Sequence, residues 1–264
     1  MHTKTELTAL LREHGIRLSK RLGQHYLVDP NMCRKLVSLC ELSPGDTVIE
    51  IGPGLGALTD LLAARCQRLI AVEVDRGVSR LLTDRMAHLP NVEVRHQDIL
   101  EFPWDAHAGA KVVGAIPYHI TSEILVALCG HAQYISAAWL GMQQEVAQRL
   151  SVLVQYRFAV TVLAKMPRGT FFPAPDVDST WLRLEPHRQP PVAVEDEALF
   201  FEVVKSAFAQ RRKTLANCLM ALSRTMTRAQ VLAWLGAAGL PPGVRGEELS
   251  LAQFAALANH LYTR

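Results

Sequence analysis

Apolar and polar positions follow two different rhythms along the first part of the chain. Short apolar runs predict strands, and segments whose apolar residues recur every three or four positions predict helices. Strands and helices that alternate through short loops favour a parallel sheet with helices on both faces. The strands are expected at residues 47–51, 69–74, 92–96, 111–115 and 134–142; the helices are expected at 4–16, 29–40, 76–88 and 122–129, with one more ending at Ala64 and another starting at residue 144.

After Pro186 the pattern becomes helical throughout. Helices are predicted at residues 195–208, 212–223, 228–237 and 250–262. The proline-rich stretch at 186–191 separates the two patterns, as is typical of a domain boundary. We therefore expect an α/β domain over residues 1–186, which includes a basic amino-terminal segment at 1–28, and a small all-helical domain over residues 187–264.

Composition narrows the class of protein. The 264 residues are 49% apolar and 20% charged, with a formal net charge of +3, which is ordinary for a soluble globular protein. Five cysteines form no CxxC pair and ten histidines show no ligand spacing, so we expect reduced thiols and no metal site. The sequence shows neither a signal-peptide core nor an apolar run long enough for a membrane span, which predicts a cytoplasmic protein.

A glycine-rich turn joins the strand at 47–51 to the helix that follows it. It reads Glu50-Ile51-Gly52-Pro53-Gly54-Leu55-Gly56, and glycines there let the backbone turn tightly and approach a ligand. Glu73 ends the next strand about 20 residues further on, where such folds place a carboxylate on a ribose. Asp98 follows the third strand, where a carboxylate can accept a hydrogen bond from an adenine amine. These features share one sheet edge and predict a nucleoside-containing cofactor.

Two cofactors compete for this edge. A nicotinamide dinucleotide carries a pyrophosphate, which a charged Glu50 two residues before the first glycine would repel. S-adenosylmethionine carries no phosphate and fits the turn better. The pattern therefore favours the Rossmann-like sheet of a class I methyltransferase.

The loop after the fourth strand reads Ala115-Ile116-Pro117-Tyr118. A Pro-Tyr pair just past a strand end suits the holding of a flat ring. Taken alone, the pair is explained equally well by a rigid turn with a half-buried tyrosine.

Six segments make the chain resemble the ribosomal RNA adenine N6-dimethyltransferases, the KsgA/Dim1 proteins, to which the Erm methylases are related. They are similar to the family's R-x-G-Q-N/H-F-L-x-D motif, cofactor loop, ribose strand, F-x-P-x-P-x-V-x-S, F-x-x-R-R-K-T-L and R-x-E-x-L-S motifs. In chain order, the segments are residues 21–29, 48–59, 71–75, 171–179, 208–215 and 245–250.

The resemblance implies S-adenosylmethionine-dependent N6-dimethylation of two adjacent adenines near the 3′ end of small-subunit rRNA, with a role in 30S ribosome biogenesis. It implies a monomer that acts on pre-30S particles. The Ile116 carbonyl would accept a hydrogen bond from the target amine, while Tyr118 and Phe171 would stack on the flipped base. The implied cofactor-binding residues are His25, Leu27, Gly52, Gly54, Glu73, Asp98 and Ala115, and the implied catalytic residues are Ala115, Ile116, Pro117, Tyr118 and Phe171.

The chain departs from the family at two places. Ala115 stands where the family's N-L/I-P-Y motif has asparagine, and its methyl group cannot accept a hydrogen bond, so we expect an impaired methyl-transfer step. Near residues 150–151 the chain joins directly two segments that relatives separate by a longer loop. A shortened loop there would weaken the positioning of RNA.

Basic side chains gather in two clusters, one before the cofactor motifs and one in the helical domain. Beside a base-flipping pocket they are expected to contact RNA phosphates, which position a duplex and carry little sequence information. The predicted RNA-binding residues are Arg17, Lys20, Arg21, Arg211, Arg212 and Lys213.

Other functions stay open at this level. Ala115 favours a ribosome-assembly factor with little or no catalysis. An Erm-type enzyme would modify large-subunit rRNA instead. A small-molecule methyltransferase is disfavoured by the basic helical domain.

Overall fold

The structure is a computed structural model that describes residues 4–16, 23–143, 146, 152–208, 213–220 and 227–262; for Tyr118 and Tyr262 it describes the backbone alone. The chain forms two compact units. The first comprises Met1–Leu150 with Phe158–Pro186, and the second Ser151–Arg157 with His187–Arg264. The short segment 151–157 therefore belongs with the helical unit, which differs from the single boundary expected at residue 186.

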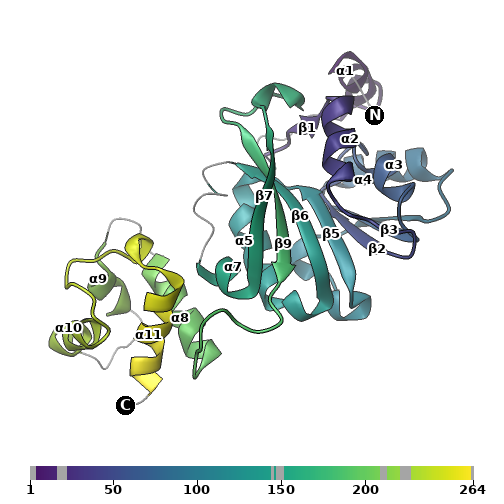
Figure 1. Cartoon of the computed structure of the whole chain (residues 1–264). Helices are drawn as coiled ribbons and strands as arrows, with labels where there is room; N and C mark the ends of the chain where they lie inside the picture. Colours follow the sequence, from purple (N-terminus) through teal and green to yellow (C-terminus); the bar gives the residue numbers. More distant parts are fainter. Residues whose placement is uncertain are drawn as a thin grey trace. The chain divides into compact units, whose positions relative to one another are not determined.

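A seven-stranded sheet forms the centre of the first unit, in the order β4-β3-β2-β5-β6-β9-β7 (Figure 1). The chain leaves β2 towards β3 on one side and returns to β5 on the other, so the carboxyl ends of β2 and β5 flank a switch in strand order. Ligands bind at such switch points in open α/β sheets. The strands are β2 Thr47–Ile51, β3 Arg68–Glu73, β4 Val92–His96, β5 Ala110–Ala115, β6 Ile135–Gln143, β7 Phe158–Met166 and β9 Ser179–Pro186.

The sheet is mixed, whereas the sequence pattern favoured a parallel one. The strands from β4 to β6 are parallel, but β9 runs antiparallel to β6, and β7 runs antiparallel to β9. Neither β7 nor β9 was expected from the sequence. β7, the last strand in the sheet order, mixes buried and exposed positions although its sequence, FAVTVLAKM, is mostly apolar.

Helices cover the sheet of the first unit. The apolar residues of α2 Pro30–Ser38 and α3 Thr59–Ala63 share one core cluster with Val48, Leu69 and Val113 of the central strands. Asp29 caps α2 by accepting hydrogen bonds from the backbone of Asn31 and Met32, as its Asp-Pro start predicts. Other α-helices in the described part of this unit are α1 Lys4–Glu13, α4 Arg76–Met86 and α5 Thr121–Gly130.

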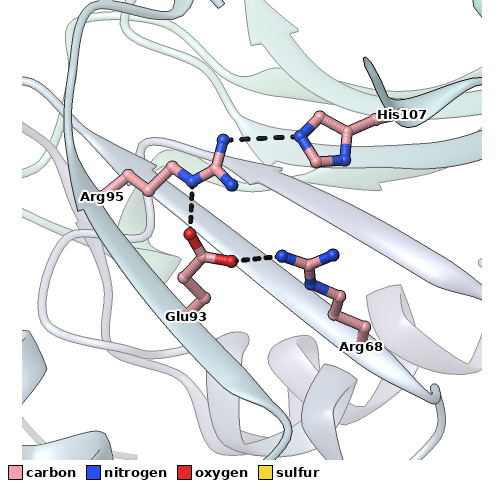
Figure 2. Close-up of polar contacts among 4 residues, drawn as sticks. All are labelled: Arg68, Glu93, Arg95 and His107. Atoms are coloured by element: carbon pink, nitrogen blue, oxygen red, sulfur yellow. Dashed lines mark hydrogen bonds and ion pairs between the residues drawn. The ribbon is translucent and has the colours of Figure 1, made fainter. Parts of the chain in front are cut away.

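Charged side chains protect the sheet at its β4 edge. Glu93 accepts hydrogen bonds from Arg68 and Arg95, and Arg95 also donates to Nε2 of His107 (Figure 2). Burial, together with the nearby arginine charges, lowers the pKa of His107. Charged edge strands of this kind resist pairing with another chain.

The second unit is helical around its own core. The α-helices among its described residues are α7 Val152–Arg157, α8 Glu197–Phe208, α9 Leu215–Leu219, α10 Arg228–Ala237 and α11 Leu251–Tyr262. Tyr156 of α7 packs against Phe200 of α8, with their ring centroids 4.8 Å apart, and Arg157 forms an ion pair with Glu197. These contacts explain why α7 groups with this unit. No helix in the described part of the chain is long and apolar enough to cross a membrane.

Candidate active site

One cavity lies at the carboxyl ends of β2, β3, β4 and β5 in the first unit. It collects site residues that are far apart in the sequence. The structure places there His25, Leu27, Gly52, Gly54, Glu73, Asp98, Ala115, Ile116, Pro117 and Phe171. Tyr118 follows Pro117 directly at the start of a short 3-10 turn, and its side chain lies outside the described part of the structure.

The glycine turn lines one side of the cavity. Two of its glycines have a left-handed backbone conformation, which other residues adopt only under strain. Gly52 and Gly54 have φ angles of 62° and 56°. A Cβ atom on Gly54 would lie 2.7 Å from the ring of Tyr26. The turn therefore needs glycine at residue 54 for two reasons: its backbone angle and the close ring.

Glu73 is the buried carboxylate at the end of β3. Its side chain accepts hydrogen bonds from the backbone N–H groups of Gly54, at 3.1 Å, and Asp75, at 2.9 Å. These bonds tie the carboxylate to the glycine turn, and burial raises its pKa. Each carboxylate oxygen keeps a further lone pair, which can accept a hydrogen bond from a ligand hydroxyl.

Glu50 is buried, which weakens the prediction that its negative charge would repel a pyrophosphate. It is only 1% exposed, it accepts a hydrogen bond of 2.7 Å from Oγ1 of Thr59, and burial raises its pKa to about 8. Glu50 is therefore mostly protonated at neutral pH, and its charge cannot be the main reason against a pyrophosphate. The stronger reason is that the described residues lining the cavity include no lysine or arginine to neutralise phosphates.

Asp98 lies at the far end of the cavity with apolar neighbours. Its carboxylate accepts a hydrogen bond of 2.9 Å from the backbone of Leu100. Val74 and Leu100 line the same cavity and are 45% and 40% exposed, unusually open for large apolar side chains. An apolar slot with a carboxylate beside it suits an adenine ring. The two carboxylates, Asp98 and Glu73, and the apolar slot fit the adenosine part of S-adenosylmethionine. The described lining residues include no lysine or arginine, which suits a cofactor without phosphates.

The loop after β5 also lines the cavity, with Pro117 close to Gly52. Ala115 pairs with Gly141 of β6, and the Ile116 N–H donates a 3.0 Å hydrogen bond to the Gly141 carbonyl. The Ile116 side chain is buried, and the Thr121 hydroxyl donates to the Pro117 carbonyl. The backbone is thus fixed on both sides of Pro117, while residue 115 presents a methyl group.

A small second sheet closes the cavity by bringing two distant motifs together. Strand β1 Tyr26–Leu27 pairs antiparallel with β8 Phe171–Phe172, which sets Leu27 opposite Phe171. His25 lies within hydrogen-bond distance, 2.7 Å from Nδ1 to the carbonyl of Pro173. The two motifs were recognised from the sequence, but their pairing was not.

The predicted RNA-binding residues lie mostly outside the described structure. Arg17, Lys20, Arg21, Arg211 and Arg212 belong to this group. Lys213 is described and exposed, in the second unit.

Several cavity residues were not singled out from the sequence as site residues. Ser179 ends the F-x-P-x-P-x-V-x-S motif, and His119 follows Tyr118 in the loop after β5, which is the signal that could have pointed to it. Tyr26 stands where the family motif has phenylalanine, and its hydroxyl is buried without a hydrogen-bond partner in the described structure. Gly141 had no local signal, because it reaches the cavity only through the pairing of β5 with β6.

Comparison with known proteins gives consistent matches over almost the whole chain. The family model described as "Ribosomal RNA adenine dimethylase" matches residues 15–262. Ribosomal RNA small subunit methyltransferase A of Moorella thermoacetica is 40% identical, covering 96% of both chains. The protein of the same name from Streptococcus pneumoniae is also 40% identical, covering 96% of this chain and 95% of the relative.

The alignment with the Moorella protein spans 277 positions, more than the 264 residues of this chain, so that relative has residues without a counterpart here. Such residues are expected if an internal loop is shortened, and their location stays a prediction.

Solved structures agree with the fold. The crystal structure of the 23S rRNA methyltransferase ErmE has a TM-score of 0.64 at 28% identity, covering 90% of this chain and 99% of that chain. A dimethyladenosine transferase from Plasmodium falciparum has a TM-score of 0.67 at 22% identity, covering 87% of this chain and 94% of that chain, and this likeness supports the fold alone. The chain belongs to the ribosomal RNA adenine dimethylase family, whose members transfer methyl groups from S-adenosylmethionine.

Proposed function

We propose that the protein dimethylates N6 of two adjacent adenines near the 3′ end of small-subunit rRNA, during biogenesis of the 30S subunit. One observation carries the proposal: a single cavity joins the nucleoside end at Glu73 and Asp98 to the loop end at Ile116, Pro117 and Phe171. A methyl donor and a flipped base can therefore meet within it. The small-subunit substrate is supported by the names of the relatives at 40% identity.

The reaction has to overcome the weakness of the target amine, because its lone pair is delocalised into the adenine ring. S-adenosylmethionine supplies a methyl group on a positively charged sulfur. The Ile116 carbonyl, held by the hydrogen bond of its own N–H to Gly141, accepts a hydrogen bond from the amine and helps to aim the lone pair. Phe171, which is buried at the cavity wall, and Tyr118 hold the base between them.

Ala115 supports a second function, that of a ribosome-assembly factor that binds the precursor particle with little turnover. The side chain at this position lines the cavity and has no oxygen with which to accept a second hydrogen bond from the amine. The other binding features of the cavity do not depend on it.

One experiment separates these functions. Purified protein is incubated with labelled S-adenosylmethionine and either unmethylated 30S subunits, 30S subunits already dimethylated at the two adenines, or 50S subunits. Incorporation into the unmethylated 30S subunits alone supports the proposed dimethyltransferase. Binding to 30S without incorporation supports the assembly factor, and incorporation into 50S subunits supports an Erm-type enzyme.

A further inference from the structure

His119 is an exposed histidine in the wall of the cavity, four residues after Ala115 in the same loop. It sits in the 3-10 turn Tyr118–Ile120, which is closed by a hydrogen bond from the Ile120 N–H to the Pro117 carbonyl. The Thr121 hydroxyl donates to the same carbonyl, at 3.0 Å. The backbone that carries the imidazole is therefore fixed relative to the loop that meets the target base.

The ring of His119 lies close to the backbone of Gly23. A Cβ atom on Gly23 would lie 2.8 Å from Nδ1 of the ring, and Gly23 has a φ of 54°, so a side chain there would displace the imidazole. Its Nδ1 edge faces the backbone of Gly23. The other ring nitrogen, Nε2, carries the lone pair when the neutral imidazole bears its proton on Nδ1.

Most polar side chains of the cavity are already engaged within the protein. Glu50, Glu73 and Asp98 accept hydrogen bonds from Thr59, from two backbone groups and from Leu100. Ser179 also has a partner, and the remaining engaged side chains are Gln24, His25 and Gln97. Within the described part of the cavity, the structure gives no hydrogen bond for the side chains of Tyr26 and His119. The Tyr26 hydroxyl is enclosed by protein, whereas His119 is exposed and can meet a substrate.

From this arrangement we infer that His119 is a catalytic residue whose Nε2 accepts the hydrogen bond from the target amine that Ala115 cannot accept. After methyl transfer the amine nitrogen carries an extra proton. That proton moves to Nε2, the nitrogen keeps the electron pair of the broken N–H bond, and the imidazolium releases the proton to water. The inference rests on the proposed function and deepens it, because it names a group that compensates for Ala115.

A double-mutant cycle tests the inference. We compare single-turnover methylation of unmethylated 30S subunits by the chain as it stands, His119→Leu, Ala115→Asn and the double variant. In the alanine background, His119→Leu should lower the rate about tenfold or more, as expected for removal of a proton acceptor. In the Ala115→Asn background the loss should be markedly smaller. A loss below tenfold in the alanine background, or equal losses in both backgrounds, overturns the inference.

Two further variants keep the cycle interpretable. His119→Gln retains an oxygen acceptor, so it should keep more activity than His119→Leu. His88→Leu removes an exposed histidine just past the end of α4, outside the cavity, and serves as the matched control. If no form methylates any ribosomal subunit, the proposed function fails. Whether His119 contacts the target amine is then tested by a binding measurement that does not require methylation.

A second measurement needs no turnover. The protein is labelled with 15N-histidine, loaded with S-adenosylhomocysteine and mixed with a 3′-terminal small-subunit rRNA fragment that carries either adenine or unsubstituted purine at the target position. The Nε2 resonance of His119, assigned with the His119→Gln variant, should shift with the adenine fragment and much less with the purine fragment, which lacks the amine. Equal resonances with both fragments would show that Nε2 does not contact the amine.

Discussion

The side chain at residue 115 lies on the wall of the cavity at the end of β5, and it is partly exposed there. Ile116, Pro117 and Tyr118, which are proposed to meet the target base from this side, follow Ala115 directly in the chain. Because Ala115 pairs with Gly141 and Ile116 bonds to the same residue, the backbone geometry of the loop does not need the asparagine of the family motif. The alanine therefore removes a hydrogen-bond acceptor while it leaves the loop in place.

Restoring that acceptor gives the first prediction. Ala115→Asn should raise the single-turnover methylation rate, but by less than the about 10²–10³ that one transition-state hydrogen bond usually contributes, because His119 already accepts a hydrogen bond from the same amine. The affinity for S-adenosylmethionine should change little, because Glu73, Asp98 and the glycine turn are untouched. Ala108→Asn, at an exposed turn, is the control. Equal rates for the two residues at position 115 would refute the idea that Ala115 limits catalysis.

A second prediction concerns Glu50, whose pKa is raised from 4.5 to about 8 by burial. Below pH 4.5 both the native and the unfolded chain hold the proton. As the pH rises towards 8, the unfolded chain ionises while the native protein keeps the proton, so this residue makes the native state progressively less stable. Glu50→Gln removes the ionisation and keeps an oxygen for the Thr59 hydroxyl.

The variant should therefore gain stability over the original chain as the pH rises, by an amount on the order of a few kcal/mol at pH 8. Urea unfolding at pH 5 and pH 8 measures the difference. Glu101→Gln, at an exposed position, is the control. A stability gain of the same size at both pH values would mean that Glu50 is not protonated in the native protein.

Two elements meet at the glycine turn, and this makes it the most sensitive part of the cofactor end. Gly54 donates its N–H to Glu73, and Tyr26 of β1 lies directly against its Cα. Leu55, the next residue, packs in one cluster with Leu7 and Leu11 of α1 and with Tyr26. The turn is thus supported from the amino-terminal helix as well as from the sheet.

Gly54→Ala should disrupt this arrangement. The added Cβ would lie 2.7 Å from the Tyr26 ring, and the left-handed backbone adds strain of about 1–2 kcal/mol. We expect at least about tenfold weaker binding of S-adenosylhomocysteine, measured by calorimetry. Gly45→Ala is the matched control, because a Cβ there meets nothing within 4 Å. If both variants bind alike, the turn is not the cofactor wall.

Some of these strands and site residues could be predicted from the sequence, and others could not. The buried strands β2, β3, β5 and β6 were predictable because buried parallel strands are continuous apolar runs, whereas β4 is a half-buried edge strand in which apolar and charged residues alternate. The acids at the strand ends were predictable because the carboxyl ends of parallel strands share one edge. The strands β7 and β9 were missed, since they depend on long-range antiparallel pairing. The protonation of Glu50 was also beyond sequence reasoning, because it follows from packing rather than from residue type. His119 was missed because the contact with Gly23 joins residues almost a hundred positions apart.

At the scale of the whole molecule, the family match covers residues 15–262 and so includes residues of both compact units. The cavity belongs to the first unit, and the second unit has its own core and helices. The chain has a modest net charge of +3, so its attraction to RNA depends on where basic residues gather rather than on their total. The densest run, Arg211, Arg212 and Lys213, falls in the second unit.

The last prediction tests whether this run binds RNA. Replacing Arg211, Arg212 and Lys213 together with glutamine should weaken binding to unmethylated 30S subunits and reduce the slope of log affinity against log salt by about 2–3, because each lost phosphate contact releases about one counterion fewer. The control replaces Lys35, Arg76 and Arg80, which are exposed in the first unit, and should leave the slope nearly unchanged. Filter binding across a salt series measures the affinity and the salt slope of both variants.

Binding of S-adenosylhomocysteine should be equal in all forms, since the described residues that line the cavity include none of these six residues. An unchanged slope in the first variant would show that these three residues make no phosphate contacts, and equal losses in both variants would mean that the attraction comes from net charge alone.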